Sequence, residues 1–201
     1  MNTVSFLNLP TLLTLFRLVF SPFILPILLV TFLPYNNFAI NVSLTMVFSL
    51  LSLTDLLDGY MARKFSQETE LGKVLDPIAD KFLMYATLIS LLAVHKIYYY
   101  WVILLIGREF FIMGLRLIAV QNNFTIAVSF YGKLKTMVQF FYFAFAILNP
   151  ALLHAALEMP FFLIQSCLLA STLLLSCGSA YMYYQEFIKM IKIRVYEGDF
   201  R

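Results

Sequence analysis

The chain has 201 residues, of which 62% are hydrophobic and 12% are charged, with a formal net charge of +3 and a mean hydropathy of +0.86. Soluble domains carry about 25% charged residues, so this composition excludes a soluble enzyme and indicates an integral membrane protein. At about 20 residues per transmembrane helix, the length allows roughly six spans and no second domain. The sequence therefore predicts one all-α membrane domain over residues 1–201.

The apolar runs predict these elements in chain order. Residues 2–16 mix apolar and polar side chains and predict an interfacial helix that leads into the first span. Residues 34–37 predict an uncharged turn, residues 63–70 a polar connection, and His95 with Lys96 the end of the third span. The six predicted transmembrane helices cover residues 17–33, 38–57, 74–94, 97–120, 131–149 and 161–184.

The two cysteines, Cys167 and Cys177, both fall in the sixth predicted span. Ten helical residues separate them by about 15 Å, which is too far for a disulfide. We therefore interpret both as small core residues.

The Lys and Arg positions predict the orientation of the chain. Six spans place both termini on one side, and all of the 14 Lys and Arg residues except Lys96 lie on that side or lead in from it. Positive residues concentrate on the cytoplasmic side of membrane proteins. Both termini, and the polar end of the second span, are therefore expected at the cytoplasmic face.

The most informative pattern is a set of eight residues around the junction of the second and third spans. On a helix with 3.6 residues per turn, Asp55 and Asp58 lie about 60° apart, and Asp76 and Asp80 about 40° apart. If the two helices are neighbours, the pairs converge as hard oxygen ligands of the kind that divalent cations prefer. The eight residues are Asp55, Asp58, Gly59, Ala62, Arg63, Gly72, Asp76 and Asp80.

Simpler interpretations of this pattern are less satisfactory. Asp58 and Gly59 alone are typical of a helix end followed by a turn. A helix end does not require a second acidic pair at helical spacing in the next apolar segment, and charge at membrane depth usually lines a cavity or binds a ligand. An EF-hand alternates its acidic residues and closes with a glutamate, which this pattern does not do. A divalent-metal site is therefore favoured.

The spacing D-x2-D-G-x2-A-R-x8-G-x3-D-x3-D resembles the signature of the CDP-alcohol phosphotransferase family at every position. The resemblance implies six transmembrane helices, a homodimer, and a cytoplasmic site for two Mg²⁺ or Mn²⁺ ions. Asp55, Asp58, Asp76 and Asp80 would hold these ions, with Asp80 also the general base. The residues implied to bind the CDP group are Asp58, Gly59, Ala62, Arg63 and Gly72, with Arg63 on the phosphates.

A second charged cluster bears on the acceptor. Arg108 and Arg116 are eight residues apart and lie within about 80° on the fourth predicted span. Arg108 is too deep to snorkel easily, which predicts a phosphate or carboxylate partner, and Glu109 could pair with one of the bases. Lys133 and Lys135 open the fifth span, where snorkelling explains them equally well. The cluster predicts a phosphorylated acceptor such as glycerol 3-phosphate.

Further stretches are similar to bacterial phosphatidylglycerophosphate synthases, namely residues 8–17, 75–81, 107–109, 114–116 and 132–136. This similarity implies transfer of a phosphatidyl group from CDP-diacylglycerol to glycerol 3-phosphate at the bacterial inner membrane. The partners would be these two substrates and membrane lipids, without nucleic acid.

Other functions remain open at this point. Bacterial-type cardiolipin synthases share several of these stretches, so the acceptor could be phosphatidylglycerol, and inositol phosphate or serine are further alternatives. Residues 117–119 are apolar where an acidic residue is expected after the arginine. A divalent-cation transporter would need acidic residues leading to both faces, and Glu158 is the only one predicted on the far side.

Overall fold

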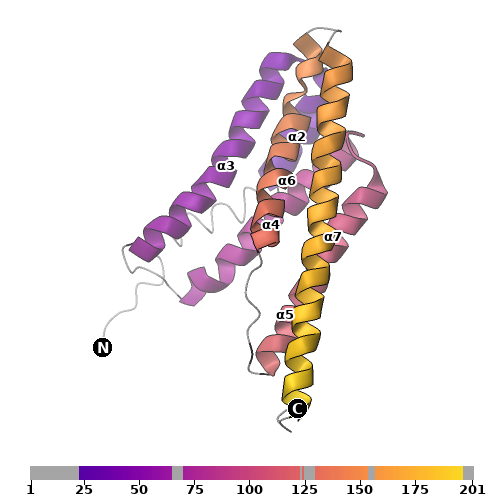
Figure 1. Cartoon of the computed structure of the whole chain (residues 1–201). Helices are drawn as coiled ribbons and strands as arrows, with labels where there is room; N and C mark the ends of the chain where they lie inside the picture. Colours follow the sequence, from indigo (N-terminus) through magenta and orange to yellow (C-terminus); the bar gives the residue numbers. More distant parts are fainter. Residues whose placement is uncertain (1–22, 65–69, 123, 125–129, 154–156, 197–201) are drawn as a thin grey trace, which may run out of the picture. The chain divides into compact units, whose positions relative to one another are not determined.

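The computed structural model describes residues 23–64, 70–122, 124, 130–153 and 157–196. Within these ranges the chain is all-α, as predicted, with no β-strand (Figure 1). The interfacial helix expected at residues 2–16 lies outside them. The elements are α2 (Leu25–Phe32), η2 (Leu33–Tyr35), α3 (Phe38–Lys64), α4 (Glu70–Ala93), α5 (Tyr99–Gln121), α6 (Phe130–Leu148), η3 (Pro150–Leu153) and α7 (Glu158–Tyr196).

The helix ends follow the predicted spans closely in α5 and α6, and less closely elsewhere. α3 continues to Lys64 and α7 to Tyr196, both well past the predicted ends of their apolar runs. Hydropathy marks the part of a helix that suits a membrane, whereas charged residues such as Lys, Arg and Glu are good helix formers. The predicted connection at residues 63–70 is accordingly shorter, because its first two residues belong to α3 and its last to α4.

The turn before α3 forms where the sequence predicts it. Asn36 adopts a left-handed conformation with φ of 52°, which ends η2. The Asn37 Oδ1 atom then accepts hydrogen bonds from the backbone N–H groups of Ala39, at 2.9 Å, and Ile40, at 3.4 Å. These bonds satisfy two N–H groups that an isolated helix start would leave unpaired.

The end of α4 is also as predicted, and its geometry explains why it stops there. His95 has a left-handed φ of 57°. The Lys96 N–H donates to the Leu91 carbonyl at 2.8 Å, and the His95 N–H to the Leu92 carbonyl at 3.0 Å. This is the Schellman pattern, in which the last carbonyls of a helix are satisfied as the chain turns away.

The helices group into two compact units. The first holds the described parts of residues 1–98 together with residues 144–158. In it, α2 packs against both α3 and α4, and α3 also contacts α4. The adjacency of α3 and α4, on which convergence of the two aspartate pairs depends, is therefore present. Buried residues of this unit include Leu25, Leu29, Leu33, Phe48, Leu83, Leu88 and Leu91.

The second unit holds residues 99–143 and the chain from residue 159 onward. It contains α5, most of α6 and nearly all of α7, whose 39 residues run about 58 Å as one helix (Figure 1). A cluster of buried side chains joins α5, α7 and the segment after α5. Its members are Ile112, Leu115, Ala119, Phe124, Tyr183 and Phe187.

One helical segment in the described part of the chain, Glu158–Ile193, is long and apolar enough to cross a bilayer by length and composition. Its most apolar stretch is 11% buried, unlike the core helix of a soluble protein. α5 has 23 residues, also a spanning length, but carries Arg108, Glu109 and Arg116. The other apolar helical segments identified are shorter: Leu25–Tyr35, Phe38–Leu53 and Lys81–Ala93.

The core interpretation of the two cysteines is wrong. Cys167 and Cys177 both lie on α7, and both are free and exposed. A helix that faces lipid uses the same apolar residue types as a helix that faces a protein core, so hydropathy cannot separate the two environments.

Lys96 links the end of α4 to the end of α6. Its Nζ atom donates to the Ala146 carbonyl at 3.1 Å, in the last turn of α6. Asn41 of α3 contacts the same end of α6, since its Nδ2 atom donates to the Leu148 carbonyl at 3.4 Å. Burial lowers the pKa of Lys96 from its ordinary 10.5 to about 8, because a buried ammonium loses hydration.

We expect this lowered pKa to make stability depend on pH. Between about pH 8 and pH 10.5 the unfolded chain binds a proton at Lys96 that the folded chain has lost, so the free energy of unfolding rises with pH over this window. The measurement is the thermal midpoint of the detergent-solubilised protein against pH, compared with Lys96→Met. The difference between wild type and variant should grow in favour of wild type from pH 8 to 10. A constant difference would contradict the lowered pKa.

Candidate active site

The eight motif residues lie on two helices that contact each other. α3 carries Asp55, Asp58, Gly59, Ala62 and Arg63, and α4 carries the rest, namely Gly72, Asp76 and Asp80. Because the segments that carry the aspartates are α-helical, the members of each pair fall on one face of their helix. The side chains of residues 54–80 lie outside those that the structure describes, so the convergence of the pairs stays a prediction.

The motif's donor set suits a divalent cation. Four carboxylates supply the hard oxygen ligands that Mg²⁺ and Mn²⁺ prefer, and α3 and α4 are neighbours. Among the side chains that are described, no group of three or more His, Cys, Asp or Glu could hold a metal ion. The described part of the chain therefore offers no competing metal centre.

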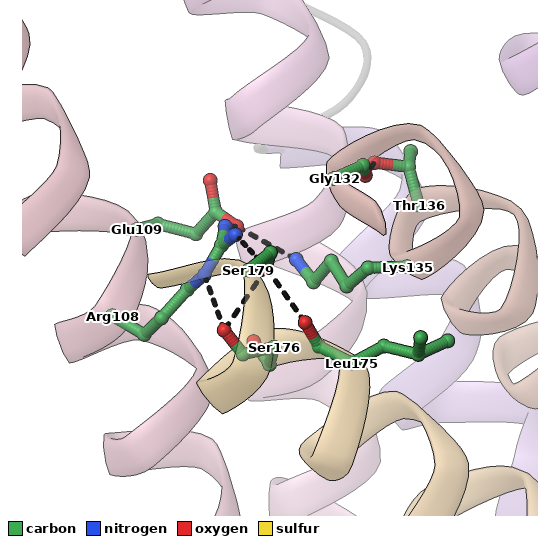
Figure 2. A network of polar contacts seen from close by, with 8 residues as sticks. All are labelled: Arg108, Glu109, Gly132, Lys135, Thr136, Leu175, Ser176 and Ser179. Carbon is green, nitrogen blue, oxygen red and sulfur yellow. Dashed lines mark hydrogen bonds and ion pairs between the residues drawn. The ribbon is translucent and has the colours of Figure 1, made fainter. Parts of the chain in front are cut away.

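The second charged cluster is organised around Glu109, near the middle of α5 (Figure 2). One carboxylate oxygen, Oε1, accepts from Arg108 Nη1 at 2.5 Å and from Lys135 Nζ at 2.7 Å. Glu109 is 7% exposed and Lys135 4%. A buried carboxylate thus joins two cations from α5 and α6, which offsets the cost of removing each charge from water.

Arg108 also links α5 to α7. Its Nε atom donates to the Ser176 carbonyl at 3.1 Å, and its Nη2 atom donates to Ser179 Oγ at 2.5 Å. Each of the three guanidinium nitrogens therefore donates to an acceptor of the protein, which keeps the planar group fixed (Figure 2). The pairing of Glu109 with the bases that the sequence suggested is confirmed, whereas binding of a phosphorylated acceptor by Arg108 stays a prediction.

The remaining bases of the cluster have other surroundings. Arg116 is exposed, donates from Nε to the Tyr183 hydroxyl at 2.9 Å, and has its guanidinium carbon 5.3 Å from the centre of the Tyr183 ring. Lys133 is exposed and Lys135 is buried. Side chains two positions apart on a helix point about 160° away from each other, so the two lysines face opposite sides of α6. The structure thus brings Arg108 and Lys135 together and does not bring Lys133 to them.

Sequence reasoning missed the part of this cluster that comes from α7. Ser176, Ser179 and Tyr183 lie three and four residues apart and are buried on one face of an otherwise apolar helix. Small hydroxyl residues at such spacing are typical of contacts between membrane helices, and this signal could have identified α7 as the partner of the arginines.

The chain is similar to a family of known enzymes. A family model described as CDP-alcohol phosphatidyltransferase matches residues 7–178, which include the whole motif, Arg108 and Lys135. Three relatives named CDP-diacylglycerol–glycerol-3-phosphate 3-phosphatidyltransferase align well. The relative of Wigglesworthia glossinidia brevipalpis is 38% identical over 66% of this chain and 72% of its own length. That of Rickettsia felis is 36% identical over 71% of this chain and 76% of its own length. That of Salmonella choleraesuis is 37% identical over 71% of this chain and 78% of its own length.

We expect Ser179→Ala to destabilise the protein by about 1–3 kcal/mol, because it leaves the partly buried Arg108 Nη2 without this acceptor. The free energy of unfolding in detergent and denaturant would measure the loss. Ser171→Ala is the matched control, since Ser171 is an exposed serine of the same helix. Equal stabilities of the two variants would show that the Arg108–Ser179 contact contributes little.

Proposed function

We propose that this chain, which belongs to the CDP-alcohol phosphatidyltransferase family, transfers a phosphatidyl group from CDP-diacylglycerol to glycerol 3-phosphate. The products are phosphatidylglycerophosphate and CMP. The observation that carries this proposal is the complete eight-residue motif on two contacting helices. The relatives support the choice of acceptor, since their shared name states the same reaction and the chain covers more than two thirds of each.

Divalent metal ions generally serve the reactions of this family. In this chain the four aspartates Asp55, Asp58, Asp76 and Asp80 would hold two Mg²⁺ or Mn²⁺ ions. When bound, such ions neutralise a pyrophosphate and stabilise a phosphate leaving group.

The CDP group of the donor would lie along α3 and the start of α4. Gly59, Ala62 and Gly72 carry at most one side-chain carbon each, so the nucleotide can approach the backbone there. Asp58 completes this contact surface, and Arg63 would donate to the phosphates, because a guanidinium matches phosphate oxygens with paired N–H groups.

Asp80 would act as the general base. It would accept the proton of the acceptor hydroxyl while the hydroxyl oxygen attacks the phosphorus on the lipid side of the pyrophosphate. A P–O bond to the acceptor forms, the P–O bond to CMP breaks, and CMP leaves with the electron pair. No covalent intermediate with the enzyme is required.

The acceptor's phosphate would bind to Arg108 and Lys135, with Arg116 and Lys133 drawing anions toward the site. Two observations support this role for Arg108 and Lys135. The three hydrogen bonds that Arg108 donates to described residues use three of its five N–H groups, which leaves two for a further acceptor. Nearby, the buried Ser176 hydroxyl has no hydrogen-bond partner among the described residues.

The site would face the cytoplasm of a bacterial inner-membrane protein with six spans in a single domain over residues 1–201. The distribution of Lys and Arg supports this orientation, and the exposed apolar length of α7 supports the membrane location. The family resemblance favours a homodimer.

The acceptor is tested by CMP release from the detergent-purified chain, given CDP-diacylglycerol and Mg²⁺ or Mn²⁺. Glycerol 3-phosphate, phosphatidylglycerol, inositol 1-phosphate and serine are supplied in turn, with a chelator control. We expect turnover with glycerol 3-phosphate alone, and its loss on chelation. Turnover with phosphatidylglycerol instead would make the chain a cardiolipin synthase and overturn the acceptor proposed here.

We expect Asp80→Asn to reduce kcat by at least about 100-fold, since a positioned general base typically contributes a factor of 10²–10⁴. The thermal midpoint should stay close to that of wild type. Asp199→Asn is the control, because residue 199 lies outside the motif. A near-native kcat for Asp80→Asn would reject the base assignment and weaken the metal assignment.

A further inference from the structure

Glu109 holds two cations at one point of the protein. Arg108 Nη1 and Lys135 Nζ donate to the same carboxylate oxygen, at 2.5 Å and 2.7 Å. The two nitrogens can therefore be no farther apart than the sum of these distances. A phosphate group has three terminal oxygens, so one phosphate placed beside this pair can contact both nitrogens.

We propose that Glu109 is the positioning residue of the acceptor site, and that its carboxylate sets Arg108 and Lys135 to bind the acceptor's phosphate together. This inference rests on the proposed function, because it assumes a phosphorylated acceptor. Glu109 does not itself contact the substrate and acts through the two cations.

A carboxylate is needed between Arg108 and Lys135 because the two cations lie close together away from water. Two like charges this close repel each other strongly where water is scarce, and Glu109 and Lys135 are both buried. A negative oxygen between them offsets that repulsion before any acceptor arrives. It also removes rotamer freedom from two long side chains, which would otherwise lose that freedom on binding.

Contacts on more than one side hold the Arg108 guanidinium in place. Ser176 and Ser179 of α7 fix the guanidinium through Nε and Nη2, while Glu109 fixes it through Nη1. The Ser179 hydroxyl is itself held, since it lies 2.6 Å from the Leu175 carbonyl and 3.0 Å from the Ser176 carbonyl. Glu109 Oε1 also accepts from Lys135 Nζ, so this carboxylate connects the second cation to the frame that holds Arg108 (Figure 2).

The test measures the KM for glycerol 3-phosphate and the KM for CDP-diacylglycerol in the full-length chain. Glu109→Gln keeps the shape and removes the charge. We expect its acceptor KM to rise on the order of tenfold or more, as for a hydrogen bond to a charged group, while the donor KM and the kcat at saturating acceptor stay within about twofold. Glu186→Gln, an exposed glutamate of α7, should leave both constants unchanged.

A double-mutant cycle separates positioning from general stabilisation. If Glu109 acts through Lys135, Glu109→Gln should add little to the acceptor KM once Lys135→Met is present. Additive effects of the two changes, or equal rises in the two KM values for Glu109→Gln, would overturn the proposal. A lower acceptor KM in Glu109→Gln would also overturn it, because Glu109 would then be competing with the phosphate.

If Glu109→Gln does not fold, Glu109→Asp replaces it in the test. It keeps the charge but shortens the side chain by one methylene, so the acceptor KM should rise by a smaller factor at an unchanged donor KM. An unchanged acceptor KM in a folded Glu109→Asp or Glu109→Gln, with wild type active on glycerol 3-phosphate, would reject the inference alone. A wild type that releases no CMP with glycerol 3-phosphate would reject the proposed function, and the inference with it.

Discussion

The pairing of buried charge is the constraint on which the described site depends. An apolar helical chain cannot leave an ion without a partner, since even one isolated charge in a low-dielectric interior costs several kcal/mol. Glu109 satisfies this condition for Arg108 and Lys135 with a single oxygen atom. The consequence is structural as well as electrostatic: α5, α6 and α7 meet where their polar side chains meet, and the apolar cluster around Ile112 and Tyr183 packs along the same helices.

The charged residues fall into two sets with different chemistry. The four motif aspartates lie on α3 and α4 of one compact unit, and the four bases of the second charged cluster lie on α5 and α6 of the other. Carboxylates bind cations and the phosphates that accompany them, whereas guanidinium and ammonium groups bind anions directly. The proposed reaction needs both, because its donor carries a pyrophosphate and its acceptor a separate phosphate.

The sequence alone predicted the helical fold, the family and the helix face shared by each aspartate pair. Apolar runs locate α5 and α6 to within two residues, and the fixed spacing of the aspartates places each pair on one helix face. The helical extensions of α3 and α7 escaped prediction because hydropathy does not report where a polar helix ends. The exposure of Cys167 and Cys177, and the contacts of Ser176 and Ser179, depend on which face of α7 meets a neighbour, and spacing within one helix cannot reveal that.

Of the three apolar residues after Arg116, the surroundings explain Ala119, which is buried, whereas Leu117 and Ile118 are exposed. Ala119 is buried against Phe124 and Phe187, so a carboxylate at that position would be desolvated. Arg116 is held instead by the hydroxyl and ring of Tyr183, which fix its position without cancelling its charge. An acidic neighbour would have neutralised Arg116, whereas a phenol leaves it attractive to anions. The contact with Tyr183 therefore leaves Arg116 compatible with an anionic acceptor.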